Sequence, residues 1–431
     1  MKRTHRSCWL RLLPMCLGVV LLVACQVGQT AQAPSVPPAT TPAAGSDTSP
    51  VPATDTPAAP TVVPTAATPS LPAPAFLYVH ETALLAQVAG GEPQRLAELP
   101  DLGAVLDARR VGEVVFVLCE RGLQRAALGD GSSEVVVRFD PPVRFGSIDP
   151  LPQGTQILYE AVVDDPQAEF GMRTEIGLYQ ADRDRSQTVL STASSLTVLG
   201  MASDGRSLYL VPHGQDPSFG RVLVVALDGG QVEAELDVLG DPIASLAPDS
   251  RFLVATMPQD VLNLYDLASA TVKARRVSLP NPPSHVRDLF WASDGRSLYF
   301  SLLGGDFYSY DPLNPPDPHG LWRLEVEAGT LTQVTTGEKG ERQLLAMSPG
   351  GEWLVTGDLA GTVQVWEARS GREMGQARAP QGEMYAAGIS PDGDWLLLRH
   401  FSEEAVLLVH LPGGESASFT LPAGAVVAGW R

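Results

Sequence analysis

From residue 76 to residue 431 the chain alternates short apolar runs with turn residues, and nothing in it has the period of a long amphipathic helix. One phrase recurs: an apolar run, a tight turn and a second apolar run. The Asp-Gly or Gly-Gly pair in the turn supplies the positive φ that a tight hairpin needs. The pattern therefore predicts an all-β domain. The clearest copies lie at 201–211, 291–301, 345–357 and 388–398, and weaker copies lie at 106–118, 148–160 and 245–255.

The hairpin turns recur at a nearly constant spacing, with intervals of 42 to 56 residues. A repeat of about 40–45 residues that holds four strands is typical of a β-propeller. The two longest intervals contain insertions, which lengthen them. The turns fall near residues 112, 154, 205, 250, 295, 351 and 393.

The two ends of this domain complete each other. It opens with the runs FLYVHE, ALLAQV and PQRLAEL, which read as the three strands that follow a hairpin turn. Residues 426–430 read as the strand that precedes one. We therefore expect the C-terminal strand to join the N-terminal blade and close the ring, which removes exposed sheet edges. The 356 residues then form eight blades of 44.5 residues on average, and seven blades of about 51 are the alternative.

The segment LVTGDLAGTVQVWEARSGRE at 354–373 resembles a blade of the WD-repeat family, with Trp366 and Glu367 where that family has Trp-Asp. The resemblance implies that Trp366 packs under the sheet and that Glu367 ends its strand. The SPDG-like turns and residues 320–335 resemble the propellers of the Tol-associated periplasmic protein and of prolyl oligopeptidases. These resemblances cover residues 76–431 and imply a fold. They do not identify a ligand, because propellers host many unrelated functions.

The first 24 residues have the pattern of an export signal. Residues 1–11 carry four basic residues and no acid, and residues 12–24 are apolar but too short for a comfortable membrane span. The apolar run ends in Leu22, Val23 and Ala24, followed by Cys25, and these residues resemble the lipobox of bacterial lipoproteins. The resemblance implies cleavage before the cysteine and acylation of its thiol. Two or more acyl chains anchor a protein stably. The alternative is a cleaved signal with an incidental cysteine. The lipobox residues are Leu22, Val23, Ala24 and the lipidated Cys25.

Residues 26–75 separate this signal from the repeats. They contain twelve prolines, many Ala, Thr and Ser residues, no aromatic residue and only two charges. Such a segment cannot bury a core, so we expect a disordered or polyproline-like tether. The expected organisation is a signal peptide at 1–24, a lipidated cysteine with its tether at 25–75, and a propeller at 76–431.

Composition excludes several classes of function. The formal net charge of −19 argues against nucleic acid as a partner, because phosphate contacts need clustered Lys and Arg. The chain has three lysines, so a Walker-type phosphate loop is not expected. No G-x-S-x-G elbow and no zinc-binding histidine pattern occur, and we expect neither a cofactor nor a metal. Cys119 ends an apolar run and is expected to be a buried residue rather than a nucleophile.

Blade geometry divides the connections between the two faces of the ring. The hairpin turns lie on one face, which we call the turn face. The loops between second and third strands, and the links between blades, lie on the other, the loop face. The tether enters at the turn face, so we expect the loop face to point away from the membrane and to carry the binding surface. The alternative is that its insertions only cover blade edges. These insertions are 162–175, 212–220 and 302–320, joined by the link 279–285.

Two of the insertions supply candidate binding residues. Aromatic and acidic side chains together suit a sugar, a cationic ligand or a partner protein, although the prolines among them equally suit a stiff loop. The acids of the other insertion are more often solvated than bound to calcium. The insertion at 302–320 offers Asp306, Phe307, Tyr308, Tyr310, Asp311, Asp317 and His319. The insertion at 162–175 offers Asp164, Asp165 and Glu169.

The sequence thus predicts an exported lipoprotein that faces the periplasm or the cell exterior. We expect a non-catalytic platform that binds a protein, a peptide or a glycan of the envelope or its surroundings. One alternative is a propeller hydrolase or lyase acting on glycans, which acids lining the mouth of the central channel would favour. Another is a structural subunit of an envelope assembly, which a large apolar patch on one face would favour.

Overall fold

A computed structural model describes part of the chain. The chain divides into two units, Met1–Thr65 and Ala66–Arg431, and every described residue belongs to the second. The predicted signal peptide, Cys25 and the tether therefore lie outside the described residues. No helix in the described part is long and apolar enough to cross a membrane. The described residues are 75–431 except 89, 152–155, 169–170, 194, 214–219, 239–242, 258–259, 270–273, 281–283, 305–317, 336–342, 359, 383 and 401–403.

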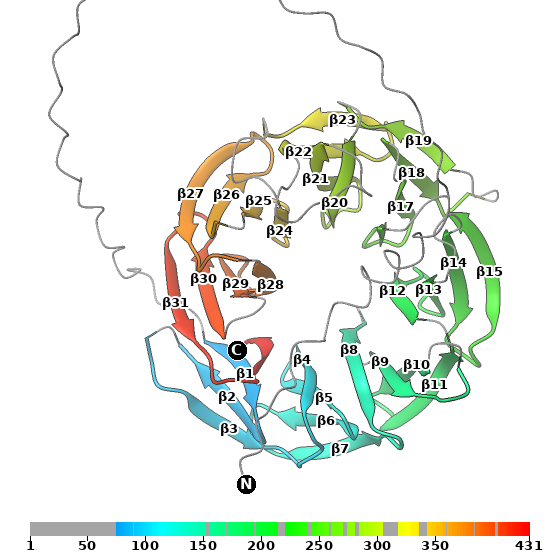
Figure 1. The fold of residues 1–431 in the computed structure, drawn as a ribbon, viewed down its shortest axis with the longest axis vertical. Helices are drawn as coiled ribbons and strands as arrows, with labels where there is room; N and C mark the ends of the chain where they lie inside the picture. The colour runs from blue at the N-terminus through cyan, green and yellow to red at the C-terminus, as the bar shows by residue number, and fades with distance from the viewer. Residues whose placement is uncertain are drawn as a thin grey trace, which may run out of the picture. The chain divides into compact units, whose positions relative to one another are not determined.

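The described residues of the second unit form eight four-stranded antiparallel sheets. Figure 1 shows these sheets as blades around a common axis, with one strand of each blade innermost and one outermost. In chain order, the first strand of blades 2 to 8 is the innermost and the fourth is the outermost. The domain is an eight-bladed β-propeller. The prediction of eight blades is confirmed, and the alternative of seven is wrong.

Blade 1 joins the two ends of the domain. It holds β32 (Val426–Trp430), β1 (Phe76–His80), β2 (Ala83–Gln87) and β3 (Gln94–Glu98). β1 and β32 run antiparallel, with Phe76 opposite Trp430. The amide of Arg431 also donates a hydrogen bond to the carbonyl of Ala75 at 2.7 Å. The predicted closure of the ring by the C-terminal strand is confirmed.

Blades 2 to 5 follow in chain order. Blade 2 holds β4 (Val105–Val111), β5 (Val114–Cys119), β6 (Gly122–Ala127) and β7 (Ser133–Arg138). Blade 3 holds β8 (Val143–Pro150), β9 (Gln156–Asp164), β10 (Met172–Gln180) and β11 (Arg185–Thr192). Blade 4 holds β12 (Ser195–Met201), β13 (Ser207–His213), β14 (Gly220–Ala226) and β15 (Val232–Val238). Blade 5 holds β16 (Ala244–Leu246), β17 (Phe252–Met257), β18 (Val261–Asp266) and β19 (Ala274–Ser278).

Blades 6 to 8 complete the ring. Blade 6 holds β20 (Ser284–Trp291), β21 (Ser297–Gly304), β22 (Pro318–Glu325) and β23 (Thr330–Gln333). Blade 7 holds β24 (Gln343–Met347), β25 (Trp353–Gly357), β26 (Thr362–Glu367) and β27 (Arg372–Arg378). Blade 8 holds β28 (Met384–Ile389), β29 (Trp395–His400), β30 (Ala405–His410) and β31 (Ser416–Thr420).

The hydrophobic core lies between neighbouring blades. Side chains along a strand alternate between the two faces of its sheet. On β5, Val115 and Val117 therefore pack with blade 1, whereas Phe116 and Leu118 pack with blade 3. The same alternation lets each of the other second strands bury both of its faces. The apolar runs of the sequence thus become strands that hold two adjacent blades together.

The hairpin turns have the geometry that their sequences predict. Gly205 takes a positive φ of 68°, and the carboxylate of Asp204 accepts the amide of Arg206 at 2.8 Å. In the weaker copy at 245–255, Ser250 stands at the same position with a φ of 57°. The side chain of Asp249 then accepts the amide of Arg251 at 2.9 Å, which fixes the turn without glycine.

The WD-like blade also behaves as expected. Trp366 is buried, and its indole N–H donates to the hydroxyl of Thr356 at 2.9 Å. Glu367 is the last residue of β26. The tryptophan therefore ties the second and third strands of blade 7 together through both packing and a hydrogen bond.

Candidate functional site

Most of the predicted aromatic and acidic insertion at 302–320 lies outside the described residues, and its described ends, 302–304 and 318–320, are strand rather than loop. Residues 305–317, which include all but one of its candidate binding residues, lie outside the described part. His319 belongs to β22, but its side chain is not described either. Glu169 of the other insertion is likewise outside. Their assignment to a binding surface stays a prediction.

The other two candidate acids of the 162–175 insertion are placed. β9 extends to Asp164 and β10 begins at Met172, so both ends of this predicted loop are strand. Asp164 pairs with Arg144 at 2.7 Å, and Asp165 pairs with Arg173 at 3.1 Å. Each carboxylate therefore has an arginine partner. No cluster of three or more metal-ligating side chains occurs among the described residues.

Acidic side chains also lie on the innermost strands, where the sequence did not single them out. Asp107 of β4 is buried, and its two carboxylate oxygens accept the amides of Ala108 at 2.8 Å and Ile148 at 2.9 Å. Arg109 lies 3.1 Å from the same carboxylate. Ile148 belongs to β8 of the next blade. Asp107 thus joins the inner strands of blades 2 and 3.

Asp288 has the same role four blades further along the chain. Its carboxylate accepts the amide of Leu344 in the next blade at 3.0 Å and the hydroxyl of Ser301 at 2.8 Å. Both aspartates sit beside an irregularity in the pairing of the first and second strands. We assign Asp107 and Asp288 a structural role in holding adjacent blades.

A second pair of acids lies close to Asp107. Ser147 is opposite Glu160 in the β8–β9 pairing, and Asp149 is opposite Leu158, so Ser147, Asp149 and Glu160 share one face of blade 3. Burial, and then the charge of Asp149, raise the pKa of Glu160 to about 7, while a hydrogen bond from Ser147 opposes the shift. Asp149 keeps contact with solvent, yet the protein packed around it raises its pKa as well. Glu160 therefore changes charge near neutral pH.

Blade 8 places an aromatic and a basic side chain near the axis. Tyr385 of the innermost strand β28 is opposite Arg399 of β29 and is 40% exposed. Burial raises the pKa of Tyr385, and the positive charges of Arg399 and Arg109 oppose that rise. Arg109 belongs to blade 2, so side chains from blades 2 and 8 act on one another on the inner side of the ring. Tyr385 remains a neutral hydrogen-bond donor at physiological pH.

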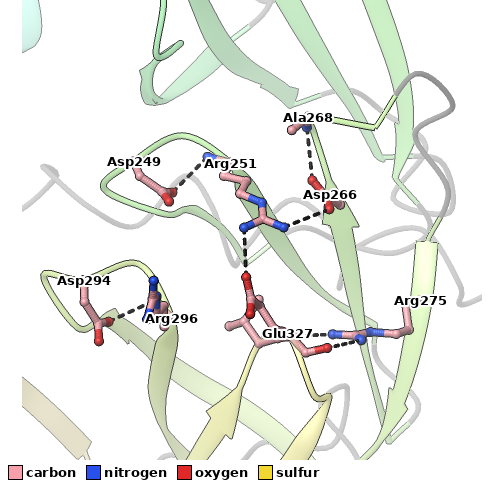
Figure 2. Close-up of polar contacts among 9 residues, drawn as sticks. Asp249, Arg251, Asp266, Ala268, Arg275, Asp294, Arg296 and Glu327 are labelled. Carbon is pink, nitrogen blue, oxygen red and sulfur yellow. Dashed lines mark hydrogen bonds and ion pairs between the residues drawn. The ribbon is translucent and has the colours of Figure 1, made fainter.

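Blades 5 and 6 are joined on the turn face by a network of charges, which Figure 2 shows. Arg251 bonds Glu327 of blade 6 at 2.8 Å and lies 3.6 Å from Asp266 of its own blade. Arg275 donates to the carbonyl of Glu327 at 2.7 Å and also to that of Val326. We call this network the clasp. Both guanidinium groups bond to blade 6, Arg251 through a carboxylate and Arg275 through backbone carbonyls, so the clasp stabilises the contact between the two blades.

The large apolar side chains that stay exposed in the described part are few and separated. They are Val88 after β2, Val232 on β15 and Tyr385 on β28. These positions belong to blades 1, 4 and 8. Within the described residues these three side chains do not form one large apolar patch.

Comparison with known proteins supports the WD-repeat-like resemblance. No family model matches the chain. A stretch of 151 residues, 35% of the chain, is 26% identical to 18% of Protein groucho of Drosophila melanogaster. Another of 62 residues, 14% of the chain, is 40% identical to 7% of Ribosome biogenesis protein ERB1 of Eremothecium gossypii. The chain thus matches less than a fifth of the length of either relative.

Two solved structures are similar in their backbone. One is hydrazine synthase of Kuenenia stuttgartiensis, with a TM-score of 0.46 and 14% identity, covering 72% of this chain and 96% of that chain. The other is a chain of the Mitotic Checkpoint Complex, with a TM-score of 0.47 and 15% identity, covering 74% of this chain and 90% of that chain.

The polar residues near the axis were not predicted, because binding residues are more often found on loops than on the inner strands of a sheet. One signal was present: a charged residue interrupts an otherwise apolar second strand in QILYEAVV, at Glu160, and in WLLLRH, at Arg399. A charged side chain in such a strand has to reach water or a partner. A charged residue in an apolar strand therefore marks a position that has a polar environment in the fold. The sequence does not show which residues of other blades make up that environment.

Proposed function

We propose that this protein is an exported lipoprotein whose propeller serves as a non-catalytic platform for a protein partner. In this proposal acylated Cys25 anchors the chain, residues 26–75 form a tether, and the propeller binds outside the cytoplasm. The observation that supports the platform most directly is the closed eight-bladed ring, whose innermost strands carry exposed polar side chains such as Arg109, Asp149 and Tyr385. Rigid rings of this kind present side chains from several blades to one ligand.

Two of the inner acids have a structural role, and two others are candidates for the alternative of an enzyme. Asp107 and Asp288 accept backbone amides of the neighbouring blade, which makes them part of the frame. Asp149 and Glu160 are the carboxyl pair that would serve a glycan hydrolase, since such enzymes use two carboxyl groups. A panel of glycan substrates tests this alternative. If the protein hydrolyses a glycan and Glu160→Gln abolishes that activity, the protein is an enzyme and the proposed non-catalytic platform is wrong.

Anchoring is tested by fractionation. The full chain and Cys25→Ala are expressed in a host that processes lipoproteins, and membranes are separated from soluble extract. We expect the full chain in the membrane fraction, carrying incorporated radiolabelled palmitate, and Cys25→Ala without the label. Retention of both chains in the membrane, without acylation of either, would contradict the lipid anchor.

The platform is tested by affinity capture from native membranes after mild cross-linking. The full chain should retain a stoichiometric protein partner. Cys25→Ala serves as the unanchored control and should lose the partner if that partner is confined to the membrane. Recovery of a monomeric, membrane-bound propeller with no partner protein would contradict the proposal.

A further inference from the structure

Three hydrogen-bond donors lie on strands of blades 8 and 1, which are neighbours where the ring closes. They are the phenol of Tyr385 on β28, the guanidinium of Arg399 on β29 and the indole of Trp430 on β32. We call these three residues the axial donor cluster. Figure 1 shows β28 innermost in blade 8, close to the C-terminal strand at the end of the chain.

Register places the first two donors side by side. Tyr385 and Arg399 are opposite each other in the β28–β29 pairing, so their side chains leave the sheet on the same face. On that face, Leu397 packs with Trp430 and Phe76 of blade 1. The phenol and the guanidinium therefore point toward the seam in which Trp430 lies.

Trp430 contributes a donor without an acceptor. Its side chain is 4% exposed, and its Nε1 has no hydrogen-bond partner among the described residues. A Cβ at Gly388 of β28 would stand 3.7 Å from this nitrogen, so the indole N–H lies against the innermost strand of blade 8. A buried N–H left unpaired is unfavourable. The nitrogen is closed to solvent in this structure, so an acceptor group of a ligand would remove that cost once the indole turned toward the axis.

The cluster has no negative charge of its own. Within the described part of the chain, no carboxylate pairs with Arg399. Asp107 is the acid that acts electrostatically on Tyr385, but its oxygens are already bonded to the amides of Ala108 and Ile148. Arg109, which lies against Asp107, adds a further positive charge near Tyr385. The seam therefore offers donors and positive charge to an incoming anion.

We propose that the axial donor cluster binds a carboxylate from an acidic segment of the partner protein. A guanidinium donates in a fork that matches a carboxylate, and such charge-assisted bonds are stronger than neutral ones. The exposed ring of Tyr385 adds an apolar surface for the residue next to the carboxylate. This inference rests on the proposed function and names the chemistry that its partner presents.

The net charge of the chain, −19, does not prevent this contact. At physiological salt the Debye length is about 8 Å. The repulsion from distant acids is therefore screened, and the donors nearest to the bound carboxylate determine its affinity. The binding measurement is therefore made at physiological salt. Its probe is a short fluorescein-labelled peptide of Glu, Asp and Gly, compared with the same peptide in which every carboxylate is an amide.

We expect fluorescence anisotropy to show that the acidic peptide binds the full chain and that the amide peptide does not. Arg399→Gln should weaken binding about tenfold or more, since it removes a charged bond. Tyr385→Phe and Trp430→Phe keep the ring and remove one donor each, so each should weaken binding about threefold. Arg276→Gln, which removes an exposed charge on the outermost strand β19, should bind as the unaltered chain does.

Three results would overturn the inference. The first is absence of acidic-peptide binding up to millimolar concentration. The second is equal affinity of the unaltered chain and Arg399→Gln. The third is binding of a phosphoserine peptide, but not of the carboxylate peptide, which would assign the cluster to phosphate instead. If Arg399→Gln still captures the same partner from membranes, the proposed platform stands and only the axial donor cluster is excluded from it.

Discussion

The carboxylate of Asp107 reaches across the gap between two blades and accepts the amide of Ile148 at 2.9 Å. Asp288 repeats this bond to Leu344 at 3.0 Å between blades 6 and 7. In both places the carboxylate of an inner-strand aspartate accepts a hydrogen bond from a backbone N–H of the next blade. That N–H lies on the innermost strand, which has no further strand of its own sheet to pair with. Apolar packing joins neighbouring blades along their length. These hydrogen bonds add a directional contact that sets the position of one blade relative to the next along the axis of the ring.

Replacing Asp107 by alanine should destabilise the propeller. The substitution leaves the buried amides of Ala108 and Ile148 without an acceptor, and an unsatisfied buried donor costs about 1–3 kcal/mol. Asp288→Ala should give a loss of similar size. Urea denaturation followed by circular dichroism measures both. Asp228→Ala, in an exposed turn of blade 4, is the matched control and should leave the midpoint unchanged. Equal midpoints for Asp107→Ala and the control would refute the role assigned to Asp107.

Much of the fold was predictable because the repeats carry local signals. Hairpin turns such as that at Gly205 require a positive φ, so Asp-Gly pairs mark them directly. The closure of the ring followed from counting strands at the two ends, and the pairing of Phe76 with Trp430 confirms it. The edges of loops were predicted less well. Residues 162–164 and 172–175 were assigned to an insertion, but they pair and extend β9 and β10.

The candidate site was not predictable in the same way. Asp107 and Glu160 come from the consecutive blades 2 and 3, whereas Tyr385 comes from blade 8, and only closure of the ring brings blade 8 close to them. Their sequence signals are single polar residues in apolar runs. The spacing of turns locates the blades but carries no information about which inner side chains face one another. Sequence therefore identifies unusual positions, and the ring assembles them into a site.

The clasp between blades 5 and 6 should contribute a small, salt-sensitive part of the stability. Arg251 bonds Glu327 across the blades, but both side chains are largely exposed and water competes for them. We expect Arg251→Ala to lower the thermal midpoint slightly at low salt. The difference should vanish at about 1 M salt, where charges are screened. Arg296→Ala, at the equivalent turn position in blade 6, is the control. A salt-independent loss would mean that packing of Arg251 on Phe252, rather than charge, is responsible.

Cys119 should be inert in the folded protein. It is 1% exposed, and burial raises the pKa of its thiol to about 11, so very little thiolate exists at neutral pH. We expect iodoacetamide to leave the peptide containing Cys119 unmodified at neutral pH and to modify it fully in denaturant. Mass spectrometry of tryptic peptides measures the labelled fraction. Rapid labelling without denaturant would show that β5 opens on the time scale of the reaction.

Glu160 should make the stability of the propeller depend on pH. Its pKa in the fold is about 7, above the ordinary value of 4.5, so the folded state binds this proton more tightly than the unfolded state. The resulting stabilisation is fully present below about pH 4.5 and is lost as pH rises through 7. A tenfold difference in proton affinity between the two states corresponds to about 1.4 kcal/mol, and with partial solvent access we expect a change of about 1–2 kcal/mol.

Glu160→Gln tests this directly, because glutamine keeps the shape of the neutral acid and does not titrate. Relative to the unaltered chain, the variant should match in stability near pH 4.5 and be about 1–2 kcal/mol more stable at pH 8. Urea denaturation across this range measures the difference, and Glu92→Gln, an exposed site, should show none. Asp149→Asn should move the transition of Glu160 to lower pH without removing it, since burial is the larger cause and the charge of Asp149 the smaller. An unchanged transition in Asp149→Asn would mean that the two carboxyl groups do not interact, which would also remove the argument for a catalytic pair.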